Sequence, residues 1–189
     1  GFFDKARMKG DFLAYFKELA ERKNIKWQHV YKHFERFVNG KCTFEEVDVD
    51  LCRKFMEYLL NAPQSIHTNQ KLHVNSAAGY WSAFRAVLHT AYRDRKIKEN
   101  PNGFLDRIEC IPTMREHLSQ EELIWLAETP CEEDVLKRAF LFACLTGLRK
   151  SDIRQLTWQQ IQPYTNGKMF VTTRMQKTKQ IVHNPISDE

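Results

Sequence analysis

The fold is decided by the stretch Thr146-Gly147-Leu148-Arg149-Lys150-Ser151-Asp152-Ile153-Arg154-Gln155-Leu156-Thr157-Trp158. An apolar helical pattern over about 133–146 runs into this stretch, and Gly147 is a typical residue for a helix C-terminus. Ser151 is a suitable N-cap for a short helix that carries Ile153 and Leu156. The stretch therefore predicts a helix, a glycine corner and a second, shorter helix, with Arg149 at the corner.

The segments on either side of this stretch extend the same unit. Residues 168–173 and 180–186 read as two strands, and a hairpin between them raises Lys177 near its tip. Upstream, Ser119-Gln120-Glu121-Glu122 is a capping box ahead of a helix that stops by Pro130.

The N-terminal half carries four helical patterns, over about 4–23, 26–38, 48–62 and 73–96. Asp48 or Asp50 caps the third helix, and residues 62–70 are polar and loop-like. The aromatic residues recur at helical spacing and are expected in the core: Phe12, Phe16, Phe34, Trp81 and Phe84. We expect a mainly α fold with a small β-hairpin, divided into a helical domain (1–98), a linker (99–113) and a second domain (114–189).

Charge and composition limit the classes of function that the chain can have. The chain has 189 residues and a formal net charge of +5. Basic residues dominate 1–100 and again 149–179, whereas 116–134 holds acidic residues and neither Lys nor Arg. Two basic segments are typical of a protein that binds a polyanion, although runs of charged residues also occur on ordinary solvated surfaces. No segment resembles a membrane span or a secretory signal, so we expect no membrane partner.

The five cysteines form no C-x-x-C pair and are odd in number, which argues against a disulfide framework and favours a reducing cytoplasm. His29 and His33 have the i, i+4 spacing that can bind a metal, but the sequence offers no third ligand, and we expect no metal.

The stretch from Thr146 to Trp158 resembles the first signature box of the tyrosine recombinases, the phage-integrase family: T-G-L-R-x-S-[DE]-[IL]-x-x-L-x-W. The helices that end at Lys98-Glu99-Asn100-Pro101 resemble that family's core-binding domain, and the capping-box helix resembles the start of its catalytic domain. The resemblance implies an N-terminal four-helix SAM-like domain followed by part of an α+β catalytic domain. Within the family, the sequence resembles the integrases of bacterial mobile elements such as conjugative transposons.

The same resemblance implies roles for two residues. Arg149 matches the family's first arginine, which donates charge-assisted hydrogen bonds to the phosphoryl group during attack by a tyrosine. Lys177 matches the family's hairpin lysine, the general acid that protonates the leaving 5′ oxygen. Lys179, two residues on, is the alternative counterpart. Family members need no cofactor and no metal for cleavage.

Candidate DNA-binding residues cluster at three places. The start of the fourth helix offers phosphate-attracting groups and an amide that can read base edges. Gly79, Ser82 and Ala86 share a face there that can approach a groove closely. With the second helix and the second domain, the full set is Lys26, Lys32, His33, Lys71, His73, Asn75, Ser76, Arg85, Lys150, Arg174 and Lys179.

The family's remaining catalytic parts are not found. No H-x-x-R box follows the signature stretch, since His183 is followed by Asn184, Pro185 and Ile186. Tyr164 lies in a predicted turn and is interpreted as structural. Both ends look cut, and we expect a fragment that binds double-stranded DNA weakly and does not cleave it.

The intact protein is then expected to be a bacterial, cytoplasmic and nucleoid-associated site-specific recombinase. It would act through a covalent phosphotyrosine in a tetrameric assembly of protomers. Two alternatives stay open. One is a non-catalytic DNA-binding or helical interaction protein on the same scaffold, and the other is a helix-turn-helix regulator over 133–161.

Overall fold

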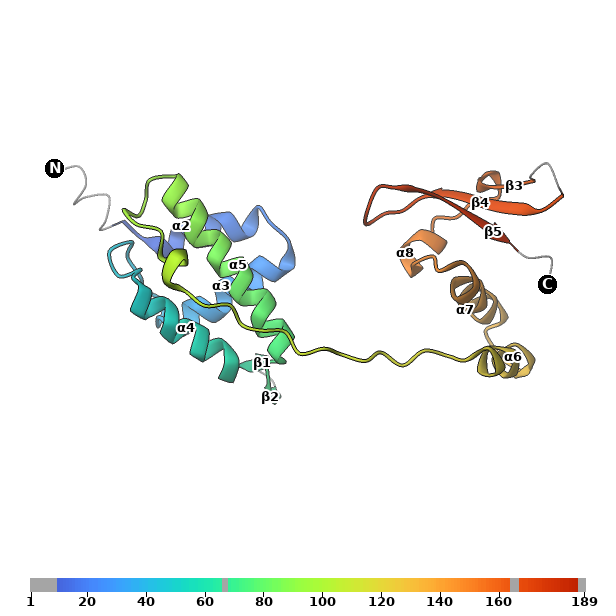
Figure 1. Ribbon diagram of the computed structural model, residues 1–189, viewed down its shortest axis with the longest axis horizontal. Coiled ribbons are helices and arrows are strands. Elements are labelled where there is room, and N and C mark those ends of the chain that lie inside the picture. Colours follow the sequence, from blue (N-terminus) through green and yellow to red (C-terminus); the bar gives the residue numbers. More distant parts are fainter. Residues whose placement is uncertain (1–9, 66–67, 164–166, 187–189) are drawn as a thin grey trace. The chain divides into compact units, whose positions relative to one another are not determined.

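The computed structural model describes residues 10–65, 68–163 and 167–186. The chain divides into two compact units, one up to Met114 and one from Arg115 onwards, and each is considered by itself (Figure 1). The predicted start of the first helix, at residue 4, lies outside the described residues.

The N-terminal unit contains α2 (Phe12–Glu21), α3 (Ile25–Phe37), α4 (Val49–Asn61), α5 (Val74–Arg93) and the 3₁₀ helix η1 (Pro101–Phe104). Side chains cap the helices where the sequence offers short polar groups. Asp11 accepts a hydrogen bond from the Ala14 amide, and Asn24 accepts one from the Lys26 amide. Asp48 caps α4 through the Leu51 amide, which decides between the two predicted caps.

An aromatic cluster forms the core of this unit, as the helical spacing predicts. Phe34 lies at the centre of the cluster, with its ring centroid 5.0 Å from that of Phe55 and 5.0 Å from that of Phe84. Phe12 and Phe16 are completely buried against the same rings, and Trp81 stacks on Phe84. Edge-to-face and offset arrangements of this kind stabilise a core beyond the area that they bury.

The segment between α4 and α5 is a hairpin, so the prediction of a loop over residues 62–70 is wrong. Strands β1 (Pro63–Ser65) and β2 (Thr68–Lys71) pair antiparallel, and the Leu72 amide donates to the Ala62 carbonyl at 2.8 Å. The pairing is compatible with proline because Pro63 begins an edge strand, where a missing N–H costs little. The short polar strands show no apolar alternation for a sequence reading to detect.

The C-terminal unit contains α6 (Gln120–Glu128), α7 (Asp134–Thr146), α8 (Lys150–Ile153), η2 (Trp158–Gln160) and three strands: β3 (Ile161–Pro163), β4 (Met169–Arg174) and β5 (Ile181–Ile186). The sheet order is β3-β4-β5, with both pairs antiparallel. The structure confirms the β4–β5 hairpin and the capping box at Ser119 and Glu122. It adds β3, which the sequence reading lacked, and Tyr164 lies outside the described residues.

The glycine corner is confirmed, but its cap is not the predicted one. Gly147 ends α7 in the left-handed region, with a φ of 66°. Arg149 is the N-cap of α8, and Ser151 lies inside that helix, so the prediction that Ser151 caps it is wrong. The backbone extends at Arg149, which brings the helix start two residues forward.

The two units differ in how much apolar surface they bury. Leu148 and Val171 are the hydrophobic residues classed as buried in the described part of the C-terminal unit. Helices α6 and α7 bury no residue fully, and the Trp125 side chain is 66% exposed. Among the described residues, no helix combines the length and the apolar character that crossing a membrane requires.

Candidate DNA interface and active-site residues

Arg149 stands at the corner between α7 and α8. Its neighbour Leu148 is buried and fixes the corner against the unit, while the Arg149 side chain is exposed. One guanidinium nitrogen, Nη1, lies 3.8 Å from the Met175 sulfur, at the end of the β4–β5 hairpin. The guanidinium therefore sits beside the hairpin turn, with donors left for an incoming anion.

The turn between β4 and β5 presents Lys177. The Met175 amide donates to the Gln180 carbonyl at 2.8 Å, and the Lys179 amide donates to the Met175 carbonyl at 2.9 Å. These bonds close a turn with Lys177 at its centre and exposed, which confirms the predicted position near the tip. Lys179 adopts a φ of 59°, so the two lysines differ in backbone conformation.

Asp152, which the sequence reading did not single out, holds the turn in place. Its side chain is 2% exposed, and its Oδ1 accepts a hydrogen bond of 2.8 Å from the Gln176 amide. The Gln176 side chain also donates to Gln155. The available signal was a carboxylate inside the apolar pattern of the signature stretch, since a buried acid usually has a specific partner.

A further contact fixes the end of α7. The Asn184 side-chain amide on β5 donates to the Thr146 carbonyl at 2.5 Å. The residues on both sides of Arg149 are thus bound to the β4–β5 hairpin: Thr146 to Asn184 on β5, and Asp152 to Gln176 in the turn. Arg149 and Lys177 consequently share one end of the unit, where an arginine fork and an ammonium can meet a phosphate.

Three further basic residues from the predicted set lie on this unit. Lys150, Arg174 and Lys179 are all exposed, on α8, at the end of β4 and in the turn. Their exposure leaves them accessible to a polyanion.

Around the start of α5, some of the residues predicted to bind DNA already make hydrogen bonds within the N-terminal unit. His73 is the N-cap, and its Nδ1 accepts a hydrogen bond of 3.1 Å from the Asn75 amide. Lys71 donates to the Asn61 side chain at 3.2 Å. Lys71, His73 and Ser76 remain exposed, as do Lys26 and Lys32 on α3.

His33 does not lie on this surface, and the expectation that it faces DNA is corrected. It is buried between the rings of Tyr58 and Tyr80, whose centroids are 6.1 and 5.5 Å away. Its helical position puts it on the apolar stripe beside Phe34. His29, four residues before His33 and considered with it as a metal-binding pair, contacts the Tyr80 hydroxyl at 3.2 Å. The described residues contain no cluster of three metal-ligating side chains.

The side chains of Asn75 and Arg85 form hydrogen bonds with other parts of the N-terminal unit. Asn75 makes two hydrogen bonds to the backbone of Ile111, and Arg85 makes two to Asn102. A groove of about 790 Å³ runs beside them, between α5 and residues 100–110. Gly79, Ser82 and Ala86 line it, with basic groups from Arg85, His89 and Arg107.

The fold of the chain is similar to that of lambda integrase, and its helical N-terminal unit contains a phage integrase SAM-like domain. Residues 11–105, half of the chain, match the family model of the phage integrase SAM-like domain, and the chain belongs to this family. No curated protein sequence matches the chain.

Two solved structures of lambda integrase are similar to the chain. One is a dimer bound to a COC′ core site, with a TM-score of 0.67 and 18% identity over 95% of this chain. The other is a tetramer bound to a Holliday junction, with a TM-score of 0.64 and 19% identity over 94% of this chain. Each match covers 50% of the solved chain, so this chain spans about half the length of the structures it matches.

Proposed function

We propose that the chain is the DNA-binding part and the first part of the active site of a tyrosine-type site-specific DNA recombinase. The observation that carries this proposal is the meeting of Arg149 with the hairpin turn that presents Lys177, held together by Asp152. Membership of the integrase SAM-like family and the lambda-integrase-like fold support it.

The proposed chemistry assigns one task to each residue. Arg149 donates charge-assisted hydrogen bonds to the non-bridging oxygens of the scissile phosphate. Lys177 supplies a proton to the leaving 5′ oxygen, which suits an ammonium on an exposed turn. Because no H-x-x-R box follows the signature stretch in this sequence, we propose that this chain binds DNA and does not cleave it.

The proposed DNA surface omits His33, which is buried, and keeps the exposed basic residues. On the N-terminal unit these are Lys26, Lys32 and Lys71, with His73 and Ser76 at the start of α5. On the C-terminal unit they are Lys150, Arg174 and Lys179. Asn75 and Arg85 contribute only when they leave their present partners.

The intact recombinase is proposed to act in a bacterial cell, in the cytoplasm at the nucleoid. It would assemble on DNA with other protomers, as lambda integrase does in the dimer and tetramer complexes. An origin in a mobile element belongs to the same proposal and rests on the signature stretch.

Binding is tested by fluorescence anisotropy with duplex DNA over a range of salt concentrations. Replacing Lys71 with Ala should lower the affinity and reduce the slope of log affinity against log salt by about one. Lys54→Ala is the matched control, because Lys54 pairs with Asp50 on α4 and is outside the proposed surface. An unchanged slope for Lys71→Ala contradicts the proposed surface.

Cleavage is tested separately with a nicked suicide substrate, which traps a covalent protein–DNA product if the chain carries a working nucleophile. We expect no covalent product from this chain at any concentration that saturates binding. A covalent band that survives denaturation would overturn the proposal of an incomplete active site.

A further inference from the structure

The segment that follows η1 lies along α5 before it leaves the N-terminal unit (Figure 1). Asn75, near the start of α5, holds the segment at Ile111: its Nδ2 donates to the Ile111 carbonyl at 2.9 Å, and its Oδ1 accepts from the Ile111 amide at 2.8 Å. One turn and a half further along α5, the Trp81 indole N–H donates to the Asp106 carbonyl at 2.9 Å. The segment is therefore bound to the helix at two separate points.

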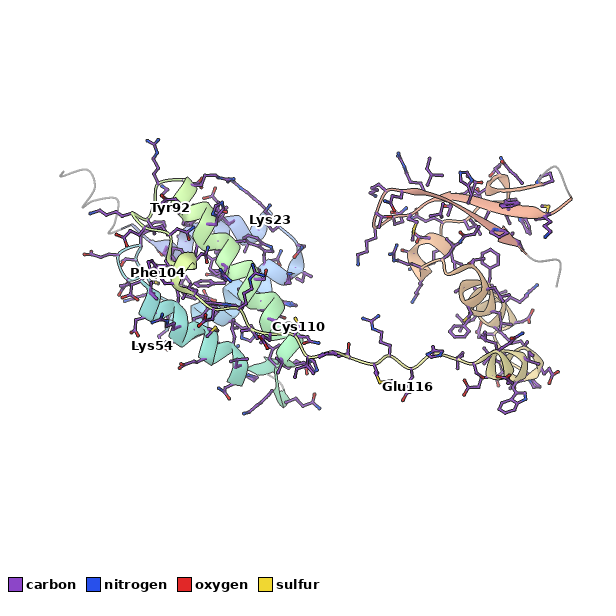
Figure 2. All side chains as sticks on the ribbon, in the orientation of Figure 1. Lys23, Lys54, Tyr92, Phe104, Cys110 and Glu116 are labelled. Carbon is purple, nitrogen blue, oxygen red and sulfur yellow. The ribbon has the colours of Figure 1, made fainter. Side chains whose placement is uncertain are left out.

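Two arginines bind the earlier part of the same segment. Arg85 donates to the Asn102 carbonyl at 3.1 Å, and the Asn102 side-chain amide donates back to the Arg85 carbonyl at 2.8 Å. Arg53 of α4 donates to the Phe104 carbonyl at 3.2 Å. Between these contacts Leu105 is buried in the core of the unit. Figure 2 labels Phe104 and Cys110, which lie near the two ends of this bound segment.

We name residues 101–111 the docked strap and residues 112–118 the free tether. The tether residues are all described and all exposed, and none of the hydrogen bonds that hold the strap involves them. Even when fully extended, the free tether spans only about 25 Å. If the part of the strap after Asp106 came loose, the connection would run from residue 107 to 118 and would span about 40 Å.

We propose that the docked strap limits the reach between the two units and that Asn75 is its latch. A short tether keeps the second unit at a high effective concentration near any site that the first unit has bound, and a longer one dilutes it. The consequence for DNA rests on the proposed function, whereas the docking and the reach do not.

The latch is tested in the whole chain with Asn75→Asp. This change removes the donor to the Ile111 carbonyl and places a carboxylate against that carbonyl, which should release the part of the strap after Asp106. The helix itself should be kept, because a carboxylate in the first turn is favourable to an α-helix. Ser82→Ala is the control, since Ser82 is exposed on the same helix and makes none of the hydrogen bonds that hold the strap.

Limited digestion with trypsin, followed by mass spectrometry, reports on the strap. Arg107 lies in the docked strap and Arg115 in the free tether, and both side chains are exposed. We expect cleavage after Arg115 to be much faster than after Arg107 in the unchanged chain. Asn75→Asp should speed cleavage after Arg107 by roughly tenfold, with no effect from Ser82→Ala. Equal rates at the two arginines in the unchanged chain would overturn the docking.

Reach is tested by small-angle X-ray scattering of Asn75→Asp, which releases the part of the strap after Asp106 and leaves Leu105 in the core. Coil statistics predict an increase of roughly 5 Å in the mean separation that the connection allows, and hence a larger maximum dimension. An unchanged dimension in a variant whose Arg107 has become susceptible would overturn the proposed limit on reach. Neither measurement uses DNA, so both stand apart from the test of DNA binding.

Discussion

His33 shows how one buried side chain couples this fold to pH. Its ring is enclosed by Tyr58 of α4 and Tyr80 of α5, and Arg36 and His29 on its own helix add positive charge nearby. Burial, and then these two basic groups, lower the pKa of His33 below its usual value of 6.5. The folded state therefore holds the imidazole neutral.

We expect the free energy of unfolding to fall as the pH drops through 6.5. Below that pH the unfolded chain binds a proton that the folded chain excludes, so stability rises with pH in this range. Denaturant titrations at pH 7.5 and 5.5 measure the effect. His33→Leu should flatten the pH dependence, whereas the exposed His89, changed to Ala, should leave it as it was. A slope that survives in His33→Leu must come from another group.

Asp152 is the second residue whose partners define its role. Asp152→Ala leaves the Gln176 amide without its acceptor and should destabilise the C-terminal unit by about 1–3 kcal/mol. The loss should appear first as faster hydrogen exchange at Gln176, next to Lys177. Asp152→Asn keeps an acceptor oxygen and should restore most of the protection. If both variants exchange at the original rate, Asp152 does not hold the turn.

Among the elements, the corner between α7 and α8 depends on the backbone of Gly147. Its φ of 66° disfavours any residue with a Cβ, although no atom lies within 4 Å of the position a Cβ would take. Gly147→Ala should therefore cost about 1 kcal/mol from backbone strain alone, as measured by denaturant unfolding. Gly103→Ala is the matched control: its surroundings are equally open and its φ is not positive. Similar losses in both variants would contradict this account.

Helix α5 offers the opposite case. Gly79 lies in its interior, and no atom lies within 4 Å of where an alanine Cβ would stand, so Gly79→Ala should stabilise the N-terminal unit by about 1 kcal/mol. If the small-residue face approaches DNA closely, the same change should weaken binding despite the gain in stability. Anisotropy and denaturation on one protein sample measure both. A more stable variant with unchanged affinity would remove Gly79 from the DNA-facing surface.

The helices were predictable because each carries its own signals. Asp48 and Ser119 cap through bonds to nearby amides, and Gly147 ends α7 as its lack of a side chain suggests. The β1–β2 hairpin was not predictable, because its polar strands show no alternation. The contacts of Asn75 with Ile111 and of Asp152 with Gln176 join residues far apart in sequence, so no local pattern announces them.

For the candidate site the same distinction applies. The signature stretch identified Arg149, and the strand pattern placed Lys177 near the turn. Neither pattern could show that Asn75 and Arg85 are already hydrogen-bonded, because their partners lie in a segment whose sequence is that of an ordinary linker. His33 was misplaced because a histidine on a helix beside basic residues looks like surface until the neighbouring helices are known.

At the scale of the whole molecule, the two units should unfold in separate steps. The N-terminal unit has a continuous aromatic core, whereas on α6 and α7 Trp125 is 66% exposed and Phe140 is 46% exposed. Because buried apolar area is the main source of stability, the C-terminal unit should open first and bind a hydrophobic dye. Hydrogen exchange followed through a thermal ramp resolves the two steps. A single transition for all amides would show that the units stabilise one another.

The hydrogen bond from Trp81 to Asp106 also bears on where the chain can be divided. A piece that ended at residue 98 would lose the acceptor of the Trp81 indole and uncover the pocket that Leu105 fills. A piece that ended after Ile111 would keep both. New sequence can accordingly be inserted, or another protein fused, between residues 112 and 118 without disturbing the helical fold. The same insertion a few residues earlier, within the docked strap, would disrupt part of the core of the N-terminal unit.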